Sequence, residues 1–384
     1  MKIGILTFHY SINPGSVIQA FCVFNLLIKG FPGAKVEIIN LIPANREKVE
    51  RGFFSVKPPF FRYRKFAKYN SIRKFVNKHL AVSKLCEHED LNKQIQYIND
   101  QAYDYIFTGS DTVWMHSEKL GNVLPHIYFL PGEIKAKKVS ISASVDPLTH
   151  ESEFLNKKDV LGSLLNDYKK VLVRDSVTYD LLKEIGVEDL DKISDPTFLY
   201  DFEKDIKLKT NKSSKLKKKV VLIEITDDKI IQDITNLLKE HSDQYQFIDR
   251  RKSLHIYEDF VIDHINLFSK IDILITDRFH SSIFAMKLSN TLVINVERYN
   301  KNPTPRSKGR DLFSRIGIPE YCIRLEKDNQ QEFNHKLISL IENWSQSEFS
   351  KRENLIDQFI NMNKELWHST LQQITMEKDN IEQV

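Results

Sequence analysis

The chain has 384 residues, 41% of them hydrophobic and 28% charged, and its formal net charge is +4. This composition is typical of a folded globular protein, and the near balance of charge excludes a chain that binds polyanions over its whole surface. Since single hydrophobic cores stop growing at about 250–300 residues, the length predicts two domains.

The three cysteines, Cys22, Cys86 and Cys322, lie far apart in the sequence. They form neither a disulfide framework nor a zinc-binding spacing, so we expect three free thiols in a reducing cytoplasm. The N-terminal segment MKIGILTFHYSINPG has only a short apolar stretch, which predicts a first strand rather than a signal peptide. No run of about 18 apolar residues predicts a membrane span.

Apolar strands alternate with helical segments through the first half of the chain. Helices are predicted over 16–30 and 90–101 from the spacing of their apolar residues. Residues 169–186 are predicted as a strand followed by a capped helix that ends at Gly186. The other strands that we predict here cover residues 2–8, 34–42, 104–110, 136–145 and 192–201.

A lysine-rich segment, KLKTNKSSKLKKK at 207–219, interrupts this alternation and is predicted to be an exposed linker. The alternation then resumes, and a helical tail follows from about 331 to 376 that can pack across both domains. The strands predicted in this half cover 219–226, 245–250, 271–276 and 291–296, and the helices cover 227–241, 258–270 and 282–289.

Continuous apolar strands separated by helices are typical of parallel sheets that are covered on both faces. We therefore expect an α/β protein with two Rossmann-like domains facing a cleft. The N-terminal domain is predicted over 1–206, the linker over 207–219, the C-terminal domain over 220–330 and the helical tail over 331–384. Ligands of such sheets bind beyond the carboxyl ends of the strands, where the polar residues of this chain gather.

The first strand leads into Asn13 and Gly15, which can form a turn and a capped helix N-terminus that suits an anion. The spacing is not GxGxxG, so a dinucleotide fingerprint is absent. Taken alone, an ordinary capped turn is the favoured interpretation of this segment.

The stretch TGSDTVW at 108–114 ends the third predicted strand. Gly109 permits a close turn, and the carboxylate of Asp111 can accept a proton or orient a hydroxyl. The alternative is an Asp or Ser helix cap with Trp114 packed behind it, and the residues favour neither interpretation over the other.

Arg174 directly follows the apolar VLV strand, and its planar guanidinium suits a carboxylate or a phosphate. The structural alternative is an ion pair with Asp175 or Asp180. We favour a binding role over the ion pair, because arginine is unusual at the end of a buried strand.

The stretch TDRFHSS at 276–282 places several chemically active groups at one strand end. Arg278 offers a fixed positive charge, and His280 can donate or accept a proton near neutral pH. Ser281 and Ser282 offer hydroxyls at the start of a helix. Together with Arg174, these residues predict a small and highly anionic substrate that carries phosphate, carboxylate or both.

The stretch KPPFFRYRKFAKYNSIRKFVNKH at 57–79 has eight Lys or Arg residues, no acid and interleaved aromatics. A solvated helical loop over the sheet is the favoured interpretation. The next is a patch for an anionic membrane surface or for a lipid-linked acceptor. Nucleic acid comes last, because no recognised binding module accompanies the stretch.

An ordered set of segments resembles the polysaccharide pyruvyl transferase family. The set spans residues 2 to about 296, and KGRDLFSRIGI at 308–318 is similar to a further family element. The matching segments are KIGILTFHYSINPGSVIQAF, YIFTGSDTVW, YFLPG through KKVSISASV, VLVRDSVTYDLLKEIG, SDPTFLYD and ITDRFHSSIFAM.

The resemblance implies a GT-B-like fold and transfer of pyruvate from phosphoenolpyruvate to a sugar of a cell-surface polysaccharide or exopolysaccharide precursor. The products would be a cyclic ketal and phosphate. The resemblance assigns Arg174, Arg278 and His280 to the donor. Our mechanistic hypothesis makes His280 and Asp111 the catalytic residues. No cofactor and no metal are expected, since the chain shows no compact cluster of ligand residues. The expected partners are phosphoenolpyruvate and a saccharide acceptor, which can be lipid-linked.

Two other functions compete with this interpretation. A GT-B glycosyltransferase would share the architecture and would need a carboxylate in the second domain for the ribose of a nucleotide-sugar, for which Glu297 is a candidate. A non-catalytic protein would use the same groups to bind an anion without reacting.

Overall fold

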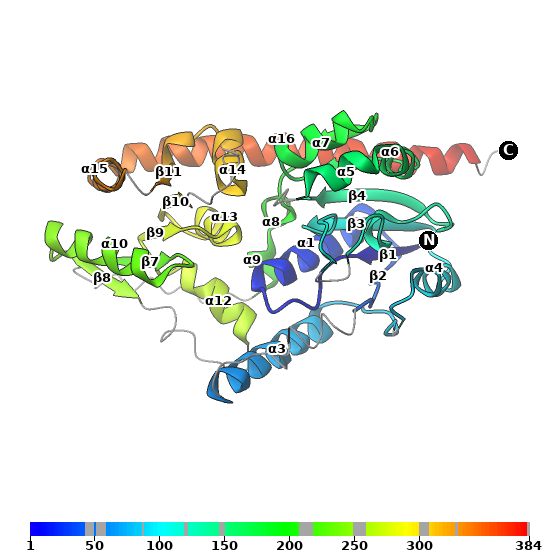
Figure 1. Cartoon of the computed structure of the whole chain (residues 1–384), viewed down its shortest axis with the longest axis horizontal. Coiled ribbons are helices and arrows are strands. Elements are labelled where there is room, and N and C mark those ends of the chain that lie inside the picture. The colour runs from blue at the N-terminus through cyan, green and yellow to red at the C-terminus, as the bar shows by residue number, and fades with distance from the viewer. Residues whose placement is uncertain are drawn as a thin grey trace. The chain divides into compact units, whose positions relative to one another are not determined.

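The structure is a computed structural model that describes residues 1–42, 50, 59–86, 88–118, 122–145, 150–206, 218–248, 259–298, 307–326 and 329–381. The chain divides into two compact units, labelled by element in Figure 1. Unit 1 comprises Met1–Tyr200, Ile256–Val261 and Met362–Val384, and unit 2 comprises Asp201–His255 and Ile262–Asn361. Most of the predicted linker, up to residue 217, lies outside the described residues.

Unit 1 is built on a six-stranded sheet whose recorded strand pairs are all parallel, in the order β2-β1-β3-β4-β5-β6. Five of the strands are buried along most of their length, which explains their near-continuous apolar sequences. The strands are β1 (Lys2–Leu6), β2 (Lys35–Ile38), β3 (Tyr105–Asp111), β4 (Lys137–Ala143), β5 (Val171–Val173) and β6 (Leu190–Lys192).

The chain reverses its direction across this sheet between β1 and β3. After β1 it adds β2 on one side, and it then returns to place β3 on the other side of β1. Leu6 of β1 lies in register with Thr108 of β3, so the carboxyl ends of the two strands are level. Such a switch point is where open α/β sheets bind their ligands.

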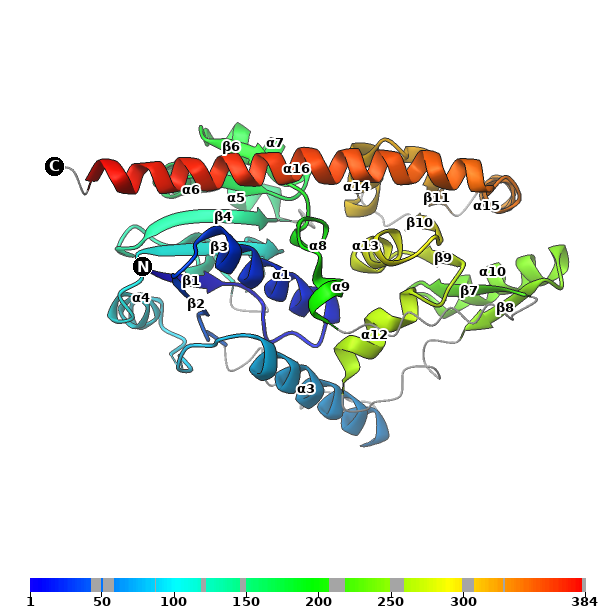
Figure 2. The ribbon, with the colours of Figure 1, turned by 180° about the vertical axis from the view of Figure 1, so that it is seen from behind.

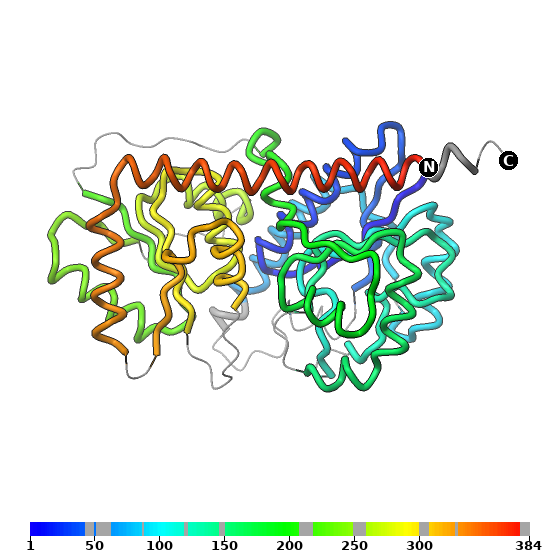
Figure 3. The backbone as a smooth tube through the Cα atoms, turned by 90° about the horizontal axis from the view of Figure 1, so that it is seen from above, coloured from blue at the N-terminus to red at the C-terminus, as the bar shows by residue number. Residues whose placement is uncertain are grey.

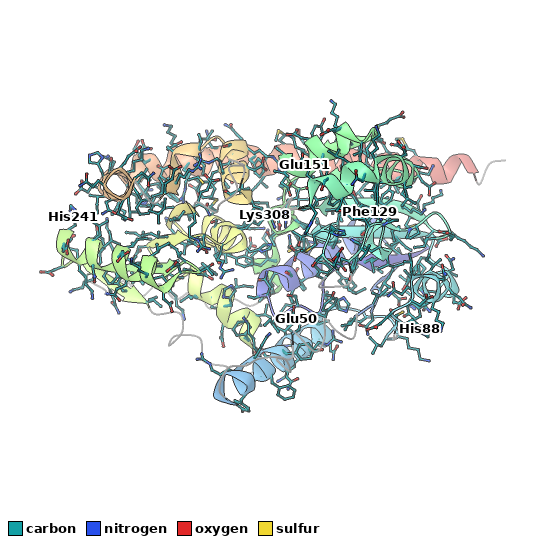
Figure 4. The ribbon with its side chains drawn as sticks, in the orientation of Figure 1. Glu50, His88, Phe129, Glu151, His241 and Lys308 are labelled. Atoms are coloured by element: carbon teal, nitrogen blue, oxygen red, sulfur yellow. The ribbon has the colours of Figure 1, made fainter. Side chains whose placement is uncertain are left out.

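Helices and a buried aromatic layer cover the sheet of unit 1. Helix α1 packs against β2 and β3 (Figure 2), and Phe129 stacks on the fully buried Trp114 within the side chains shown in Figure 4. The helices are α1 (Pro14–Gly30), α3 (Pro59–His79), α4 (Leu91–Asp100), α5 (Glu151–Asn156), α6 (Lys158–Asn166), α7 (Ser176–Glu184) and α8 (Pro196–Leu199).

Helix α16 (Gln346–Ile381) contributes its second half to unit 1. Trp367 packs edge-on against Phe107 of β3, with ring centroids 6.4 Å apart. The Tyr105 hydroxyl donates to the carbonyl of Ile374 over 3.2 Å, and the Asn363 side chain accepts from the Ser194 N–H over 2.6 Å. The final part of the predicted tail is therefore part of the core of unit 1.

Unit 2 repeats the same architecture with a five-stranded parallel sheet in the order β11-β10-β9-β7-β8, whose strands run side by side in Figure 3. The strands are β7 (Lys219–Glu224), β8 (Tyr245–Ile248), β9 (Ile273–Thr276), β10 (Leu292–Arg298) and β11 (Cys322–Leu325). The helices are α9 (Phe202–Asp205), α10 (Asp228–His241), most of α12 (Phe260–Phe268), α13 (Phe279–Leu288), α14 (Lys308–Ile316), α15 (Gln330–Glu342) and the first half of α16.

The second sheet has its own switch point, between β7 and β9. The chain adds β8 beside β7 and then places β9 on the opposite side of β7. Glu224 of β7 lies in register with Thr276 of β9, the residue at which the TDRFHSS stretch begins. This stretch therefore occupies the position in unit 2 at which ligand binding is expected.

The predicted α/β class with two Rossmann-like domains is confirmed, but three local predictions need correction. The strand predicted over 192–201 is wrong, because Asp195 caps a short helix and Pro196 occupies its first position. Helix α13 begins at Phe279 rather than at residue 282, and β11 was not predicted. The strand over 192–201 was predicted because the buried Phe198 and Leu199 give α8 the apolar pattern of a strand.

Candidate functional site

The turn after β1 carries the first predicted site residues. Asn13 is the N-cap of α1, and its side chain accepts a hydrogen bond from the N–H of Gly15 over 3.1 Å. Pro14 stands at the first helical position, where its missing N–H is not needed. Asn13 is exposed and Gly15 is buried, so the capping interpretation is confirmed, and any contact of this turn with an anion stays a prediction.

The end of β3 has an unusual backbone. Gly109, Ser110 and Asp111 have φ angles of +130°, +38° and +81°, a region that costs non-glycine residues about 1–3 kcal/mol each. A Cβ atom on Gly109 would lie 2.3 Å from the carbonyl oxygen of Ile141, so this residue must be glycine. Strain of this kind concentrates at functional sites.

This backbone directs the carboxylate of Asp111 across the switch point of unit 1. One oxygen accepts from the N–H of Thr112 over 2.8 Å, and the other accepts from the hydroxyl of Ser16 in the first turn of α1. The sheet thus brings together two segments that the sequence separates by 95 residues. Trp114 is fully buried, with its indole N–H bonded to the carbonyl of Tyr128, which confirms the packing part of the alternative. Residues 112–114 form a turn, so Asp111 does not cap a helix.

Arg174 follows β5 and is 3% exposed. Its guanidinium Nη1 lies 3.4 Å from a carboxylate oxygen of Asp195, whose side chain is fully buried. Gln19 donates to the same oxygen, and Thr197 donates to the other one through its N–H and its hydroxyl. The ion pair seen here is with Asp195, whereas sequence analysis considered Asp175 and Asp180. The donor-binding role of Arg174 stays a prediction.

His9 lies in the same turn after β1 and was not singled out from the sequence. Its ring is fully buried, with Nε2 at 3.1 Å from Asn40 Oδ1 and Nδ1 at 3.2 Å from the carbonyl oxygen of Thr7. Burial, reinforced by the positive charge of Arg73, lowers the pKa of His9 to about 4. His9 is therefore neutral at pH 7. The sequence signal that could have identified His9 was a histidine directly after an apolar strand.

In unit 2, Asp277 is the centre of the interactions at the switch point. Its Oδ2 accepts from both the N–H and the hydroxyl of Thr226, over 3.0 and 2.9 Å, across the ends of β7 and β9. Arg278 Nε lies 3.4 Å from Asp277 Oδ1, and Arg298 Nη2 lies 2.9 Å from Oδ2. Two guanidinium groups therefore share one carboxylate.

Arg278 is the more accessible of these two arginines, with 53% of its side chain exposed against 31% for Arg298. The N–H of Arg278 is bonded to the Thr276 hydroxyl over 2.9 Å, which fixes its backbone at the strand end. Arg298 was missed by sequence analysis. A charged residue at the end of the apolar TLVINV run was the available signal.

His280 lies in the first turn of α13 and is half-buried. Its ring stacks on that of Phe284 at 27° and 6.3 Å, and it meets the Phe279 ring edge-on at 5.3 Å. The imidazole is thus oriented by two aromatic neighbours on its own helix, close to Arg278 in the chain.

Ser281 and Ser282 are both buried. The Ser282 hydroxyl donates to the carbonyl of Arg278 over 3.2 Å and lies 3.5 Å from the amide of Asn295. Its contacts therefore lie in the interior of unit 2. Arg278 is the N-cap residue and makes no side-chain cap, and the N-terminus of α13 carries the positive end of the helix dipole, which suits an anion. Donor binding by the two serine hydroxyls stays a prediction.

The KGRDLFSRIGI segment forms α14 and is tied to the sheet of unit 2. Glu297 of β10 accepts from the N–H of Ser307 over 3.2 Å and from Arg310 Nε over 2.6 Å. A Cβ atom on Gly309 would lie 2.2 Å from Asn295 Oδ1, so a larger residue here, next to Lys308 at the start of the helix (Figure 4), would displace the buried Asn295 side chain. Both Glu297 oxygens have internal partners.

Among the residues that the structure describes, no three His, Cys, Asp or Glu side chains are grouped so as to hold a metal ion. None of the helices in the same residues is both long enough and apolar enough to cross a membrane.

A family model described as polysaccharide pyruvyl transferase matches residues 13–289. The chain belongs to this family. The match includes all eight predicted site residues and the switch point of unit 2. A comparison with curated proteins found no match.

Solved structures show the same fold at low sequence identity. The chain is similar to UDP-GlcNAc 2-epimerase from Neisseria meningitidis, with a TM-score of 0.50 and 13% identity over 97% of this chain and 99% of that one. It is also similar to an α,α-trehalose-phosphate synthase from Burkholderia xenovorans, with a TM-score of 0.51 and 9% identity over 97% and 99%. These similarities confirm the predicted GT-B-like fold class.

Replacement of Asp195 by alanine is expected to lower the free energy of unfolding by about 3 kcal/mol, because it removes a carboxylate from the buried Arg174 cation. The measurement is chemical denaturation of wild type, Asp195→Ala and the double variant Arg174→Met/Asp195→Ala. The double variant should recover part of the loss. Equal stability of wild type and Asp195→Ala would contradict the buried-pair assignment.

Acidification is expected to destabilise the protein through His9. The folded-state pKa of about 4 lies below the ordinary value of 6.5, so the stabilisation is present above pH 6.5 and is lost as the pH falls towards 4. The free energy of unfolding of wild type should fall by about 3 kcal/mol more than that of His9→Gln over this window. If the free energies of unfolding of wild type and His9→Gln fell equally with pH, His9 would not titrate as described.

Proposed function

We propose that the protein transfers pyruvate from phosphoenolpyruvate to two hydroxyls of a saccharide, which forms a cyclic ketal and releases phosphate. The observation that carries this proposal is the Arg278-X-His280 stretch at the switch point of unit 2, in a chain that belongs to the polysaccharide pyruvyl transferase family. The saccharide is a precursor of a cell-surface polysaccharide or an exopolysaccharide.

The donor groups match the charges of phosphoenolpyruvate, which carries both a phosphate and a carboxylate. Arg278 supplies an exposed guanidinium fork, and the positive end of α13 begins beside it. Arg174 is assigned to the donor by the family resemblance, and the turn at Asn13 and Gly15 is assigned to it because a helix N-terminus suits an anion.

The proposed reaction requires proton transfers but no redox step. One hydroxyl proton ends on the methylene carbon of the donor, which becomes a methyl group, and the other leaves with the phosphate. We assign His280 to protonate this carbon or to assist the departing phosphate, and Asp111 to accept the proton of an attacking hydroxyl. The reaction as proposed uses no metal and no other cofactor.

The main competing function is a GT-B glycosyltransferase that uses a nucleotide-sugar. Its candidate ribose-binding carboxylate, Glu297, is largely buried and already accepts from Ser307 and Arg310. This arrangement disfavours a ribose at Glu297. A non-catalytic anion-binding protein would bind phosphoenolpyruvate without releasing phosphate.

The decisive measurement is phosphate release from phosphoenolpyruvate in the presence of galactoside, mannoside or N-acetylmannosamine-containing acceptors. We expect His280→Ala to lower kcat by about 10²–10⁴-fold, because a positioned proton donor typically contributes this factor. Arg278→Lys should mainly raise the KM for phosphoenolpyruvate, about 10-fold or more, because a lysine cannot make the bidentate contact.

Lys336→Ala on the exposed face of α15 is the matched control and should behave as wild type. Full activity of the His280→Ala variant would contradict the catalytic role assigned to His280. Thermal stabilisation by nucleotide-sugars alone, with no effect of phosphoenolpyruvate, would favour the glycosyltransferase instead.

We also propose that α3 contacts an anionic membrane surface from the cytoplasmic side, where a lipid-linked acceptor would be found. Tyr63 and Phe66 lie three residues apart on the helix, with 67% and 39% of their surfaces exposed. Lys74 and Lys78 are exposed further along the same helix. Aromatic rings beside basic side chains suit the interface of an anionic bilayer.

Sedimentation with vesicles tests this contact. Wild type should bind phosphatidylglycerol-containing vesicles and not pure phosphatidylcholine ones. Lys74→Glu/Lys78→Glu should weaken binding by about 10-fold or more, since each basic residue near such a surface contributes about 1 kcal/mol. No sedimentation of wild type with anionic vesicles would rule the contact out, and the solvated-loop interpretation would stand.

A further inference from the structure

The two arginines at the switch point of unit 2 differ in kind from Arg174. The Arg174 guanidinium is buried against the fully buried carboxylate of Asp195, so its charge is compensated by a buried acid. Arg278 and Arg298 instead share the single carboxylate of Asp277. This triad therefore carries a net positive charge, and both arginine side chains are partly exposed.

The contacts of the triad leave part of each arginine available. Among the described residues, Arg278 contacts Asp277 through Nε, which leaves its Nη1–Nη2 edge for a ligand, and Arg298 contacts Asp277 through Nη2, which leaves Nη1 together with the second N–H of Nη2. Asp277 is itself held by the N–H and hydroxyl of Thr226. The carboxylate thus fixes two forked donors at one sheet edge.

We propose that Arg298 is a second donor-binding residue, and that it and Arg278 each hold one of two anionic groups on the same ligand. Asp277 is the positioning residue for both arginines. This inference rests on the proposed function, since phosphoenolpyruvate is the small ligand with a separate phosphate and carboxylate that the proposed reaction requires. It concerns a residue nine positions beyond the family match, which ends at residue 289.

A bidentate ligand explains why an arginine rather than a lysine stands at both positions. The planar fork of arginine fits a carboxylate or a phosphate with two parallel hydrogen bonds, and arginine is pre-organised by its contact with Asp277. The positive end of α13 adds to the same local field, because Arg278 is the N-cap residue of that helix.

Binding of phosphoenolpyruvate is measured by calorimetry and, separately, by steady-state kinetics for wild type, Arg298→Ala and Arg324→Ala. Arg324 is the matched control, because it lies on the neighbouring strand β11, is 33% exposed and pairs with Glu326. We expect Arg298→Ala to raise the Kd and the KM for phosphoenolpyruvate at least 10-fold, with a much smaller change in kcat. Arg324→Ala should leave all three values unchanged.

Asp277→Asn tests the positioning role through the sign of its effect. Removal of a negative charge alone would strengthen the binding of an anion, whereas the loss of the group that orients both arginines would weaken it. We expect weaker binding of phosphoenolpyruvate, with the thermal unfolding midpoint recorded to confirm that the variant is folded. Tighter binding would overturn the positioning role.

The outcomes separate this inference from the proposed function. Wild-type Kd and KM in Arg298→Ala, with activity present and Arg278→Ala impaired, would overturn the role of Arg298 and leave the function intact. Failure of wild type to bind phosphoenolpyruvate or to release phosphate with any acceptor would overturn the function. The affinity of Arg298→Lys for phosphoenolpyruvate should lie between those of wild type and Arg298→Ala. An affinity equal to that of Arg298→Ala would also support a bidentate contact, because lysine cannot make one.

Discussion

The parallel direction of the strands is the constraint on which the rest of the structure depends. When all strands of a sheet run the same way, every strand ends on the same edge, and the following helices begin there with their unpaired N–H groups. Where the strand order reverses, the helices that follow the two adjacent strands lie on opposite faces of the sheet, which leaves a crevice at that edge. In this chain both sheets obey the rule, and the polar motifs fall at β1, β3 and β5 in one unit and at β7, β9 and β10 in the other.

Charge compensation differs between Arg174 and the two arginines at the end of the second sheet. A buried guanidinium must be matched by a carboxylate, because the desolvation of an uncompensated ion costs several kcal/mol. Arg174 satisfies this requirement through Asp195. At the edge of the second sheet, two partly exposed arginines share one acid, and the excess charge is tolerated because water or an anion can reach it.

The sequence predicted the architecture well because both sheets are buried and their strands are continuously apolar. It located the turn at Asn13, the Asp111 turn and the Arg278 stretch, since each directly follows such a strand. It could not show that Asp277 joins Arg278 to Arg298, because that contact depends on β10 lying beside β9. It also failed at α8, where the burial of Phe198 and Leu199 outweighed the capping signal of Asp195 and Pro196.

The division of helix α16 between the two units has a consequence for the order of events during synthesis. Unit 1 needs Asn363, Trp367 and Ile374 for its contacts with Ser194, β3 and Tyr105, and Leu371 packs directly over Gly30 of α1. These residues leave the ribosome only after the whole of unit 2 has been translated. Unit 1 is therefore the first unit to begin and the last to be completed. Until α16 has been synthesised, the nascent sheet of unit 1 lacks the side chains of that helix.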